Sequence, residues 1–368
     1  MVSSFVFCCL SLCSAVNALY IGRHIGTQEM KGKPSWAQRA LKGNVCNTPH
    51  VKSGDKFVKR IPSWASRSGA HSVTSPPKTA VTSPPKQKRA WSMNDLERKI
   101  NATSLPEWWI SAVLRAAPAA MTLSLLYGVE FFSGEGQLAA ACCFLIGAFG
   151  SYDIKHGPSH DLLKESGLHN AIVLLLRVSA GGYAHFGTPC KSWIVLSRSW
   201  TRRSILRPQG PKLSSVSPAR ARYLKMHNEI ATRSVLLIKT ARALGIWFTL
   251  EQPVSSLLFG FCPEILVGCK SAAFGMGQFG GDSPKPLKLV GTAPWLHTFR
   301  QVYLLRTSRM KSIPLKRLTH KEGKSFTGKQ SQLVDSAGYT KCFGHCIALC
   351  VLGLNAEDVY RRLQCLDV

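Results

Sequence analysis

The sequence predicts an α/β domain: a mostly parallel β-sheet with helices on both faces. Apolar segments of strand length alternate with helix-like segments from about residue 105 to residue 250, which is the pattern of consecutive βαβ units. The first of these strands runs into a glycine turn, Gly134 and Gly136, and a helix-like segment follows at once. Short polar motifs close the later strands, and ligands of such sheets bind at the carboxyl ends of strands. The same pattern therefore predicts both a fold and the edge where a ligand binds.

The individual elements follow in order from about Leu105. A helix is expected over residues 105–126 despite Pro118, and an apolar first strand over residues 127–132. A basic loop, residues 198–220, separates the last two pairs of elements. The remaining expected elements are helix 138–147, strand 148–154, helix 167–178, strand 183–187, helix 218–244 and strand 245–250.

The chain before the core differs in composition. Residues 1–20 are apolar, rich in Cys and Ser, and end in small residues, which resembles a signal or targeting segment. Residues 21–104 form a basic, Ser/Pro-rich region that we expect to be disordered, with a transit-peptide composition up to about residue 90. The alternative is an N-terminus without a targeting role. The expected core is 105–299, and 300–368 would add a small basic substrate-contact region and a C-terminal helix completing the core. Localisation is then nuclear, or organellar if the N-terminus directs import.

The charge of the chain points to a polyanionic partner. There are 47 Lys and Arg residues against 19 Asp and Glu, a net charge of +28. Residues 1–104 hold 16 basic and 4 acidic residues, so the excess extends into the core. Nucleic acid, DNA more than RNA, is the favoured partner, and an anionic membrane surface is the alternative. The apolar N-terminal run is too short and broken for stable membrane insertion.

The cysteines give no sign of a metal or a disulfide framework. The chain has 13 cysteines but no Cys-x-x-Cys pair, and a chain of this length can stabilise itself through its core, in a reducing compartment. Cys342, His345, Cys346 and Cys350 share one face of an expected helix. Zinc binding by this group is the alternative to core packing, which we expect because no tight cysteine knuckle is present.

Four motifs follow one another along the core: Glu130–Gly136, Tyr152–Asp153, Pro189–Cys190 and Glu251–Pro253. In this order they resemble the cytosine-5 DNA methyltransferases, within the Rossmann-like class of S-adenosylmethionine (SAM)-dependent methyltransferases. The resemblance covers roughly residues 125–350. It implies SAM as the cofactor and cytosine in nucleic acid, DNA more than RNA, as the substrate.

The resemblance also implies which residues hold SAM. Asp153 closes the second strand, where an acidic residue grips the ribose hydroxyls of the cofactor. Asp161 is similar to a later acidic position near the adenine. The glycine loop and the catalytic turn supply the other expected contacts, from Phe132, Ser133, Gly134, Gly136 and Pro189.

The catalytic pair implied by the resemblance is Cys190 and Glu251. Cys190 would add to carbon 6 of cytosine, and Glu251 would hold the base through N3 and the exocyclic amine and protonate N3. The alternatives are a buried, inert Cys190 and a Glu251 that only caps a helix. The basic loop would bind phosphates of the substrate, with the expected contacts coming from Arg198, Arg202 and Arg203.

Several positions depart from the family pattern. Gln137 replaces the third glycine of the SAM loop, Lys191 the Gln after the catalytic Cys, and Gln252 the Asn after the Glu. The Gln-x-Arg-x-Arg strand that supports the Cys and the base is not evident in the sequence. Two other functions therefore stay open: a methyltransferase of the same fold acting on RNA or a small molecule, and a degenerate methyltransferase fold that serves as a nucleic-acid-binding module.

Overall fold

The computed structural model describes residues 91–281, 285–306, 316–320, 323–327 and 338–365. All of them belong to the second of the two units into which the chain divides, Thr79–Val368. The expected targeting segment, 1–20, and most of the expected Ser/Pro-rich region, 21–104, lie outside the described residues. The 300–368 region is described only in part.

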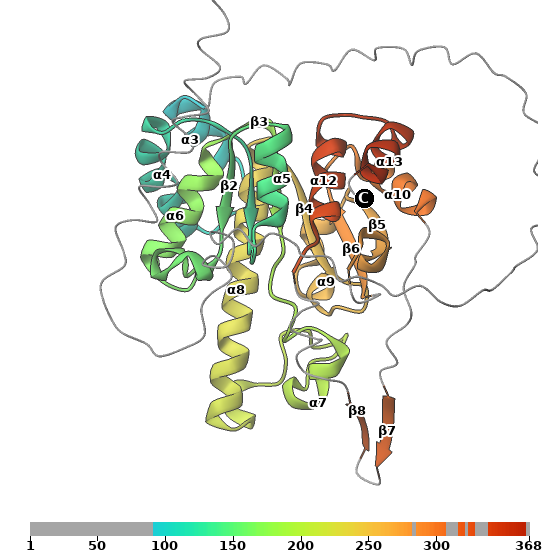
Figure 1. Ribbon diagram of the computed structural model, residues 1–368. Helices are drawn as coiled ribbons and strands as arrows, with labels where there is room; N and C mark the ends of the chain where they lie inside the picture. Colours follow the sequence, from blue (N-terminus) through green and yellow to red (C-terminus); the bar gives the residue numbers. More distant parts are fainter. Residues whose placement is uncertain (1–90, 282–284, 307–315, 321–322, 328–337, 366–368) are drawn as a thin grey trace, which may run out of the picture. The chain divides into compact units, whose positions relative to one another are not determined.

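A six-stranded sheet in the order β2-β1-β3-β4-β6-β5 forms the centre of the described fold (Figure 1). The pairs β1–β2, β1–β3 and β3–β4 are parallel, whereas β6 runs antiparallel to both β4 and β5. A second, two-stranded antiparallel sheet pairs β7 (Lys316–His320) with β8 (Gly323–Thr327). The strands of the main sheet are β1 (Leu126–Phe131), β2 (Phe149–Tyr152), β3 (Val178–Phe186), β4 (Trp247–Pro253), β5 (Lys270–Gly275) and β6 (Pro286–Gly291).

One face of the sheet is covered by helices that precede β4 in the chain. Buried side chains of these helices, among them Trp109 and Leu237, join Val129 and Phe131 of β1 in one continuous apolar core. This burial is the main stabilising contribution to the layer. The helices are α3 (Met93–Asn101), α4 (Glu107–Thr122), α6 (Glu165–Leu176) and α8 (Pro218–Ala243).

The opposite face is covered mainly by C-terminal helices (Figure 1). Leu138, Phe299, Phe343 and Ile347 belong to a second apolar core on this side. Helices therefore lie on both faces, and the predicted α/β class with a mostly parallel sheet is confirmed. The helices are α5 (Gln137–Leu145), α10 (Leu296–Leu305), α12 (Lys341–Val351) and α13 (Ala356–Gln364), and two one-turn helices, α7 (Arg198–Thr201) and α9 (Leu258–Phe261), lie in connecting segments.

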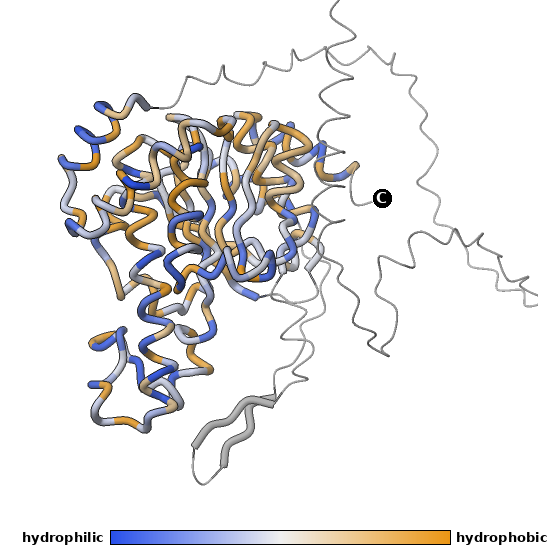
Figure 2. Tube along the Cα trace, turned by 90° about the vertical axis from the view of Figure 1, so that its left-hand side faces the viewer, coloured by the Kyte–Doolittle hydropathy of each residue, from blue (hydrophilic) through white to orange (hydrophobic). Residues whose placement is uncertain are grey.

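The sheet with its covering helices differs in hydropathy from the segment that holds α7 and the start of α8. Figure 2 shows hydrophobic residues concentrated in the sheet and its covering helices, whereas the segment with α7 and the start of α8 is richer in hydrophilic residues. Figure 1 places that segment beyond the ends of the strands. This segment is the basic loop of the sequence, residues 198–220.

Two boundaries differ from the prediction. The described fold begins before Leu105, because α3 buries Leu96 and Ile100, which lie four residues apart on one helix face, in the core. β3 begins at Val178 instead of Tyr183, with a shift in its register against β1 between Leu126 and Gly128. Strands β5 and β6 also lie after residue 250, where no strands were expected.

Candidate active site

Three strand ends meet at one edge of the sheet. β1, β3 and β4 are adjacent and parallel, with Phe131 opposite Phe186 and Phe186 opposite Leu250. The strand order reverses between β1 and β3, because β2 lies on one side of β1 and β3 on the other. In open α/β sheets the ligand crevice lies at such a reversal, beyond the carboxyl ends of the strands. The residues that follow these three positions therefore converge on one candidate site.

The loop after β1 has an unusual backbone. Phe132, Gly134 and Gly136 all have positive φ, at 60°, 57° and 66°. This conformation is unfavourable for a side-chain-bearing residue such as Phe132, and backbone strain of this kind concentrates at ligand sites. A Cβ atom added at Gly134 would meet nothing within 4 Å. The loop thus leaves open space above its backbone before α5 begins.

Asp153 holds this loop in place. One carboxylate oxygen, Oδ2, accepts a hydrogen bond from the Gly134 N–H at 2.9 Å, and Oδ1 accepts one from the Lys155 N–H at 2.9 Å. The hydroxyl of Ser151 donates to that of Ser133 at 2.7 Å. Asp153 therefore lies against the glycine loop as predicted from its motif, but both of its oxygens already bind backbone N–H groups.

Asp161 lies farther along the same connection. Its Oδ1 accepts a hydrogen bond from the Leu163 N–H at 3.1 Å, and its Oδ2 lies 4.0 Å from the ammonium group of Lys164. These contacts order the chain before α6. Among the described contacts, none joins Asp161 to the glycine loop, so its expected adenine contact remains a prediction.

The motif also contains a buried carboxyl group, Glu130, for which the sequence suggested no role. Glu130 is 0% exposed, and its Oε2 accepts a hydrogen bond from the Ala139 N–H of α5 at 2.8 Å. Its Oε1 has no partner among the described residues. Burial raises the pKa of Glu130 from 4.5 to about 8, with Asp153 adding to the rise and the Ala139 N–H opposing it.

The turns after β3 and β4 are tied together. Gln252 donates its side-chain N–H to the backbone oxygen of Thr188, and Ser256 donates its hydroxyl to the Oε1 of Gln252 at 2.9 Å. The Leu257 N–H donates to the carbonyl oxygen of Trp193 at 2.9 Å. The Gln that departs from the family motif thus joins the Cys190 turn to the Glu251 turn.

Cys190 and Glu251 interact electrostatically across these turns. Burial raises the pKa of the Cys190 thiol; the charge of Glu251 adds to the rise and that of Lys285 opposes it. Burial also raises the pKa of Glu251, against the opposing effects of Lys285 and of a hydrogen bond from Tyr339. Glu251 is 7% exposed and its Oε1 has no partner among the described residues. A buried carboxyl oxygen without a partner is costly unless a ligand binds it.

A hydrogen-bond network behind Glu251 was not predicted from the sequence. The Tyr339 hydroxyl donates to Glu251 Oε2 at 2.9 Å and lies 2.9 Å from His185 Nε2. His185 Nδ1 lies 3.0 Å from the Tyr183 hydroxyl and 2.9 Å from the Thr249 hydroxyl. A histidine inside an apolar strand was the available signal, because a buried polar group needs partners.

The arginines of the basic loop differ in how far they are exposed. Arg202 is exposed, and Arg198 is partly exposed and donates to the Ser255 oxygen at 3.3 Å. Arg203, expected to contact phosphates, is instead 3% exposed; its guanidinium lies 3.7 Å from the centre of the Trp193 ring and donates to the Ser192 hydroxyl at 2.9 Å. This corrects the prediction: Arg203 stabilises the loop from inside, because its planar group can stack and donate at once.

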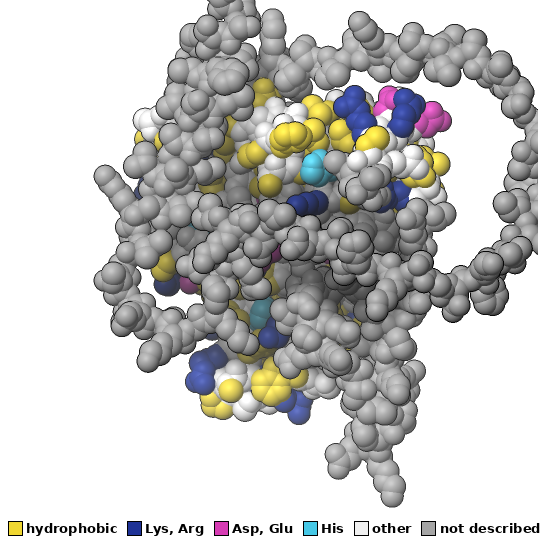
Figure 3. Space-filling view, in the orientation of Figure 1, with side chains coloured by type: hydrophobic (Ala, Val, Ile, Leu, Met, Phe, Trp, Pro, Cys, Tyr) yellow, Lys and Arg dark blue, Asp and Glu magenta, His cyan; other side chains and the backbone are white. Residues whose placement is uncertain are grey.

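The surface of this loop combines basic and hydrophobic side chains. Figure 3 shows Lys and Arg gathered with hydrophobic groups at the end of the molecule where α7 lies. Ile205 and Leu206 are 79% and 91% exposed, next to the exposed Arg207. Arg220 lies 4.6 Å from the ring centre of Trp200.

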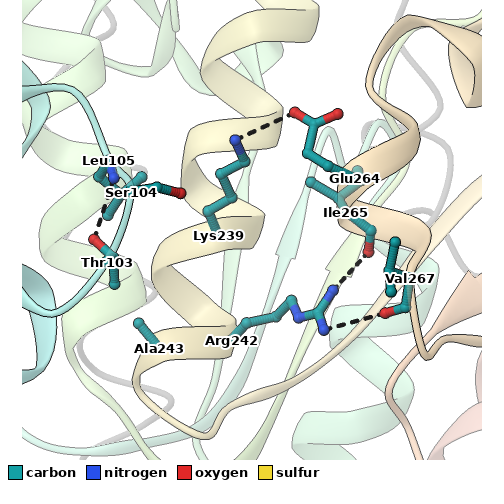
Figure 4. A pocket seen from close by; sticks show the side chains of 9 residues that line it. All are labelled: Thr103, Ser104, Leu105, Lys239, Arg242, Ala243, Glu264, Ile265 and Val267. Carbon is teal, nitrogen blue, oxygen red and sulfur yellow. Dashed lines mark hydrogen bonds and ion pairs between the residues drawn. The ribbon is translucent and has the colours of Figure 1, made fainter.

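A pocket lined by described residues lies away from this edge. It has a volume of about 630 Å³ and is bounded by residues 103–105, the end of α8 and the segment around Ile265 (Figure 4). Lys239 pairs with Glu264 at 3.2 Å, and Arg242 donates to the carbonyl oxygens of Ile265 and Val267 at 2.9 and 3.2 Å. The cations of this pocket are thus already bound within the fold, and none of the predicted site residues lines it.

Metal and membrane features were searched in the described part of the chain. There, no group of three or more His, Cys, Asp and Glu side chains could hold a metal ion. Cys342, Cys346 and Cys350 are buried in the core, as expected, whereas His345 is partly exposed. Among the described helices, none combines the length and hydrophobicity needed to cross a bilayer.

Comparison with known proteins adds no assignment. No model of a known protein family matches the chain, and no curated protein matches it. The interpretation of the site therefore depends on its geometry and on the resemblance of its motifs.

Proposed function

We propose that the protein is a SAM-dependent methyltransferase that methylates carbon 5 of cytosine in nucleic acid, DNA more than RNA, through a covalent adduct of Cys190. One observation carries the proposal. Gln252 joins the turns that follow β3 and β4, which carry the partly buried thiol of Cys190 and the buried carboxyl group of Glu251, next to the point where the strand order reverses. These are the two groups that cytosine addition chemistry needs.

The loop after β1 fits the cofactor that this function requires. Its positive-φ residues Phe132, Gly134 and Gly136 turn the chain toward the N-terminus of α5, with open space at Gly134, an arrangement that suits a polar or anionic ligand. Asp153 would hold the ribose and Asp161 would lie near the adenine, with Ser133 and Pro189 as further contacts. When bound, SAM supplies the methyl group.

The protein's own groups would activate the base. The Cys190 thiolate forms a bond with carbon 6, and the electrons of the ring's 5,6 double bond shift toward N3, which takes a proton from Glu251. Carbon 5 becomes electron-rich as a result. After methylation, N3 returns its proton to Glu251 and a water molecule takes the carbon 5 proton. The electrons of that C–H bond restore the 5,6 double bond as the Cys190 thiolate leaves. Lys285 favours the thiolate by lowering the pKa of Cys190.

The state of Glu251 supports this role. Burial raises its pKa, which favours the protonated form that can donate, and its Oε1 has no other partner among the described residues. A duplex substrate must flip the base out of the stack to reach both groups. Arg198 and Arg202, together with the basic charge of the chain, would hold the phosphates.

One observation favours a second candidate, a methyltransferase fold that binds nucleic acid without catalysis. Burial raises the pKa of Cys190, which disfavours the reactive thiolate in the free protein. Lys285 offsets this only in part. The charge of bound nucleic acid would not lower that pKa, so the second candidate predicts binding without adduct formation.

Trapping on duplex DNA that contains 5-fluorocytosine tests the proposal, because fluorine at carbon 5 prevents the final elimination. The full chain with SAM should give a gel-stable adduct. Cys190→Ser should give none, and the control Cys262→Ser, another partly buried cysteine, should react as the unchanged protein does. An adduct that persists in Cys190→Ser would refute the cysteine mechanism. SAM binding without any adduct would favour RNA or a small molecule as substrate, or the non-catalytic candidate.

A further inference from the structure

The hydrogen bonds behind Glu251 run in a defined direction. A tyrosine hydroxyl has one proton, and Tyr339 donates it to Glu251 Oε2. The Tyr339 oxygen must then accept from His185, whose Nε2 lies 2.9 Å away. The Nε2 of His185 therefore carries the ring hydrogen, and Nδ1 is bare.

The far end of the network agrees with this direction. His185 is 0% exposed, and burial lowers its pKa to about 3, so its ring is neutral and has one donor and one acceptor nitrogen. The hydroxyls of Tyr183 and Thr249 lie 2.6 Å apart, and both lie within 3.0 Å of Nδ1. Either of them can donate to the bare nitrogen. Every hydrogen bond thus points from the interior toward Glu251.

The backbone around Tyr339 secures this arrangement. Thr340 caps α12 by accepting from the Phe343 N–H at 3.1 Å and donates its hydroxyl to the Phe279 carbonyl oxygen at 2.6 Å. The Tyr339 ring packs against Phe343 with ring centres 4.9 Å apart. A Cβ atom at Gly187 would lie only 2.8 Å from the Tyr339 hydroxyl. Gly187 thus leaves the room in which that hydroxyl reaches the carboxyl group.

We propose that Tyr339 is a positioning residue for Glu251: the chain of donors from His185 through Tyr339 commits Oε2 as an acceptor and leaves the acidic hydrogen of the carboxyl group on Oε1. Oε1 is the buried oxygen without a partner among the described residues. It is therefore the atom that donates to the ring nitrogen of the base, which can only accept. This inference rests on the proposed function for the identity of the substrate, whereas the hydrogen-bond direction can be measured without it.

The charged and titratable groups around Glu251 come from several elements. Lys285 precedes β6, Cys190 follows β3, and Tyr339 precedes α12; His185 lies behind Tyr339 without charge. Glu130 of β1 acts on Tyr339. Of these, Lys285 and Tyr339 favour the ionised form of Glu251. Removal of the Tyr339 hydroxyl should therefore raise the pKa of Glu251.

The first measurement uses the unchanged full chain. Nitrogen NMR of ¹⁵N-labelled histidine, with the His185 signals assigned by their loss in His185→Gln, reports which ring nitrogen carries the hydrogen. The Nε2–H form is the expected result at neutral pH. The Nδ1–H form would overturn the inference, because the chain of donors would then run away from Glu251.

The second measurement titrates Glu251 by infrared spectroscopy, with Glu251→Gln as the reference that isolates its carboxyl band. Tyr339→Phe keeps the ring contacts and should move the midpoint to higher pH. Tyr303→Phe removes a hydroxyl that accepts from Gln278 at 3.3 Å, away from Glu251, and should leave the midpoint unchanged. A midpoint that stays or falls in Tyr339→Phe would overturn the inference.

Activity separates this inference from the proposed function. If the unchanged chain forms the adduct, Tyr339→Phe should lower kcat by about 10- to 100-fold, the scale of one hydrogen bond to a charged group, with little change in KM. Adduct formation together with the Nδ1–H form would refute the role of Tyr339 and leave the function standing. The expected NMR and infrared results without any adduct would refute the function and leave the hydrogen-bond direction standing.

Discussion

The two sides of the carboxyl edge are built in different ways. The loop side, residues 130–136 with Asp153, is held by contacts between residues 9 to 19 positions apart. The network side, Cys190 and Glu251 with Tyr339 and His185, is held by side chains up to 154 positions apart. The loop side is therefore a local backbone structure, whereas the network side exists only once the whole sheet and α12 have assembled.

Each side buries one carboxyl group. The hydrogen-bond donor to that group is a backbone N–H on the loop side and a side-chain hydroxyl on the network side. Glu130 is 0% exposed and is bonded by a backbone N–H. Glu251 is 7% exposed and is bonded by the Tyr339 hydroxyl. Burial raises the pKa of both groups. The loop side is therefore tested by changing the carboxyl group, and the network side by changing the side chain that donates to it.

The largest expected effect is on the loop side, in the pH dependence of stability. The pKa of Glu130 is about 8 in the folded chain and 4.5 ordinarily, so between these values the folded state holds a proton that the unfolded state has lost. Stability from this group is fully present below pH 4.5 and is lost as the pH rises to 8, on the order of 5 kcal/mol in total. Urea unfolding at a series of pH values measures it.

Glu130→Gln provides the comparison for that experiment. The amide oxygen can still accept from the Ala139 N–H but cannot ionise. The decline in unfolding free energy between pH 4.5 and 8 should therefore become shallower in this variant. If the unfolding free energies of the unchanged protein and of Glu130→Gln depend on pH in the same way, Glu130 does not titrate in this range. The loop side would then not be stabilised by a protonated carboxyl group.

A smaller effect is expected from Asp153, whose carboxylate orders the loop through the N–H groups of Gly134 and Lys155. Asp153→Ala should weaken SAM binding by about 1–3 kcal/mol, the scale of a charge-assisted hydrogen bond. Calorimetric titration with SAM measures this. The infrared titration of Glu251 should be the same in this variant, because no described contact joins Asp153 to the network side. A change in both would mean that the two sides are not independent.

The difference between the sides also explains what the sequence could predict. The alternation of strands and helices predicted β1 to β4 and the helices between them, because each depends on local hydrophobic periodicity. The glycine loop and Asp153 were placed together from motifs 19 residues apart. Strands β5 and β6 escaped prediction, since β6 is defined by its antiparallel pairing with strands on both sides.

Most side-chain contacts of the network side could not be predicted from the sequence. Cys190 and Glu251 were predicted as a pair from their turns, but Tyr339 lies 88 positions from Glu251 and was not considered. Arg203 was expected to contact phosphates as part of the basic loop, yet the ring of Trp193 and the Ser192 hydroxyl hold it inside. In both cases the deciding partner is a side chain that only tertiary packing brings close.

The smallest effect comes from a pair of glycines, one on each side. Gly134 has a φ of 57° with nothing within 4 Å of an added Cβ, whereas Gly187 would place a Cβ 2.8 Å from the Tyr339 hydroxyl. Gly134→Ala should cost about 1–2 kcal/mol in unfolding free energy, from backbone strain alone, and leave the titration of Glu251 unchanged. Gly187→Ala should displace the hydroxyl and raise the Glu251 midpoint, as Tyr339→Phe does. If Gly134→Ala raised the Glu251 midpoint and Gly187→Ala left it unchanged, the loop side would not be a separate backbone structure and the distinction between the two sides would be wrong.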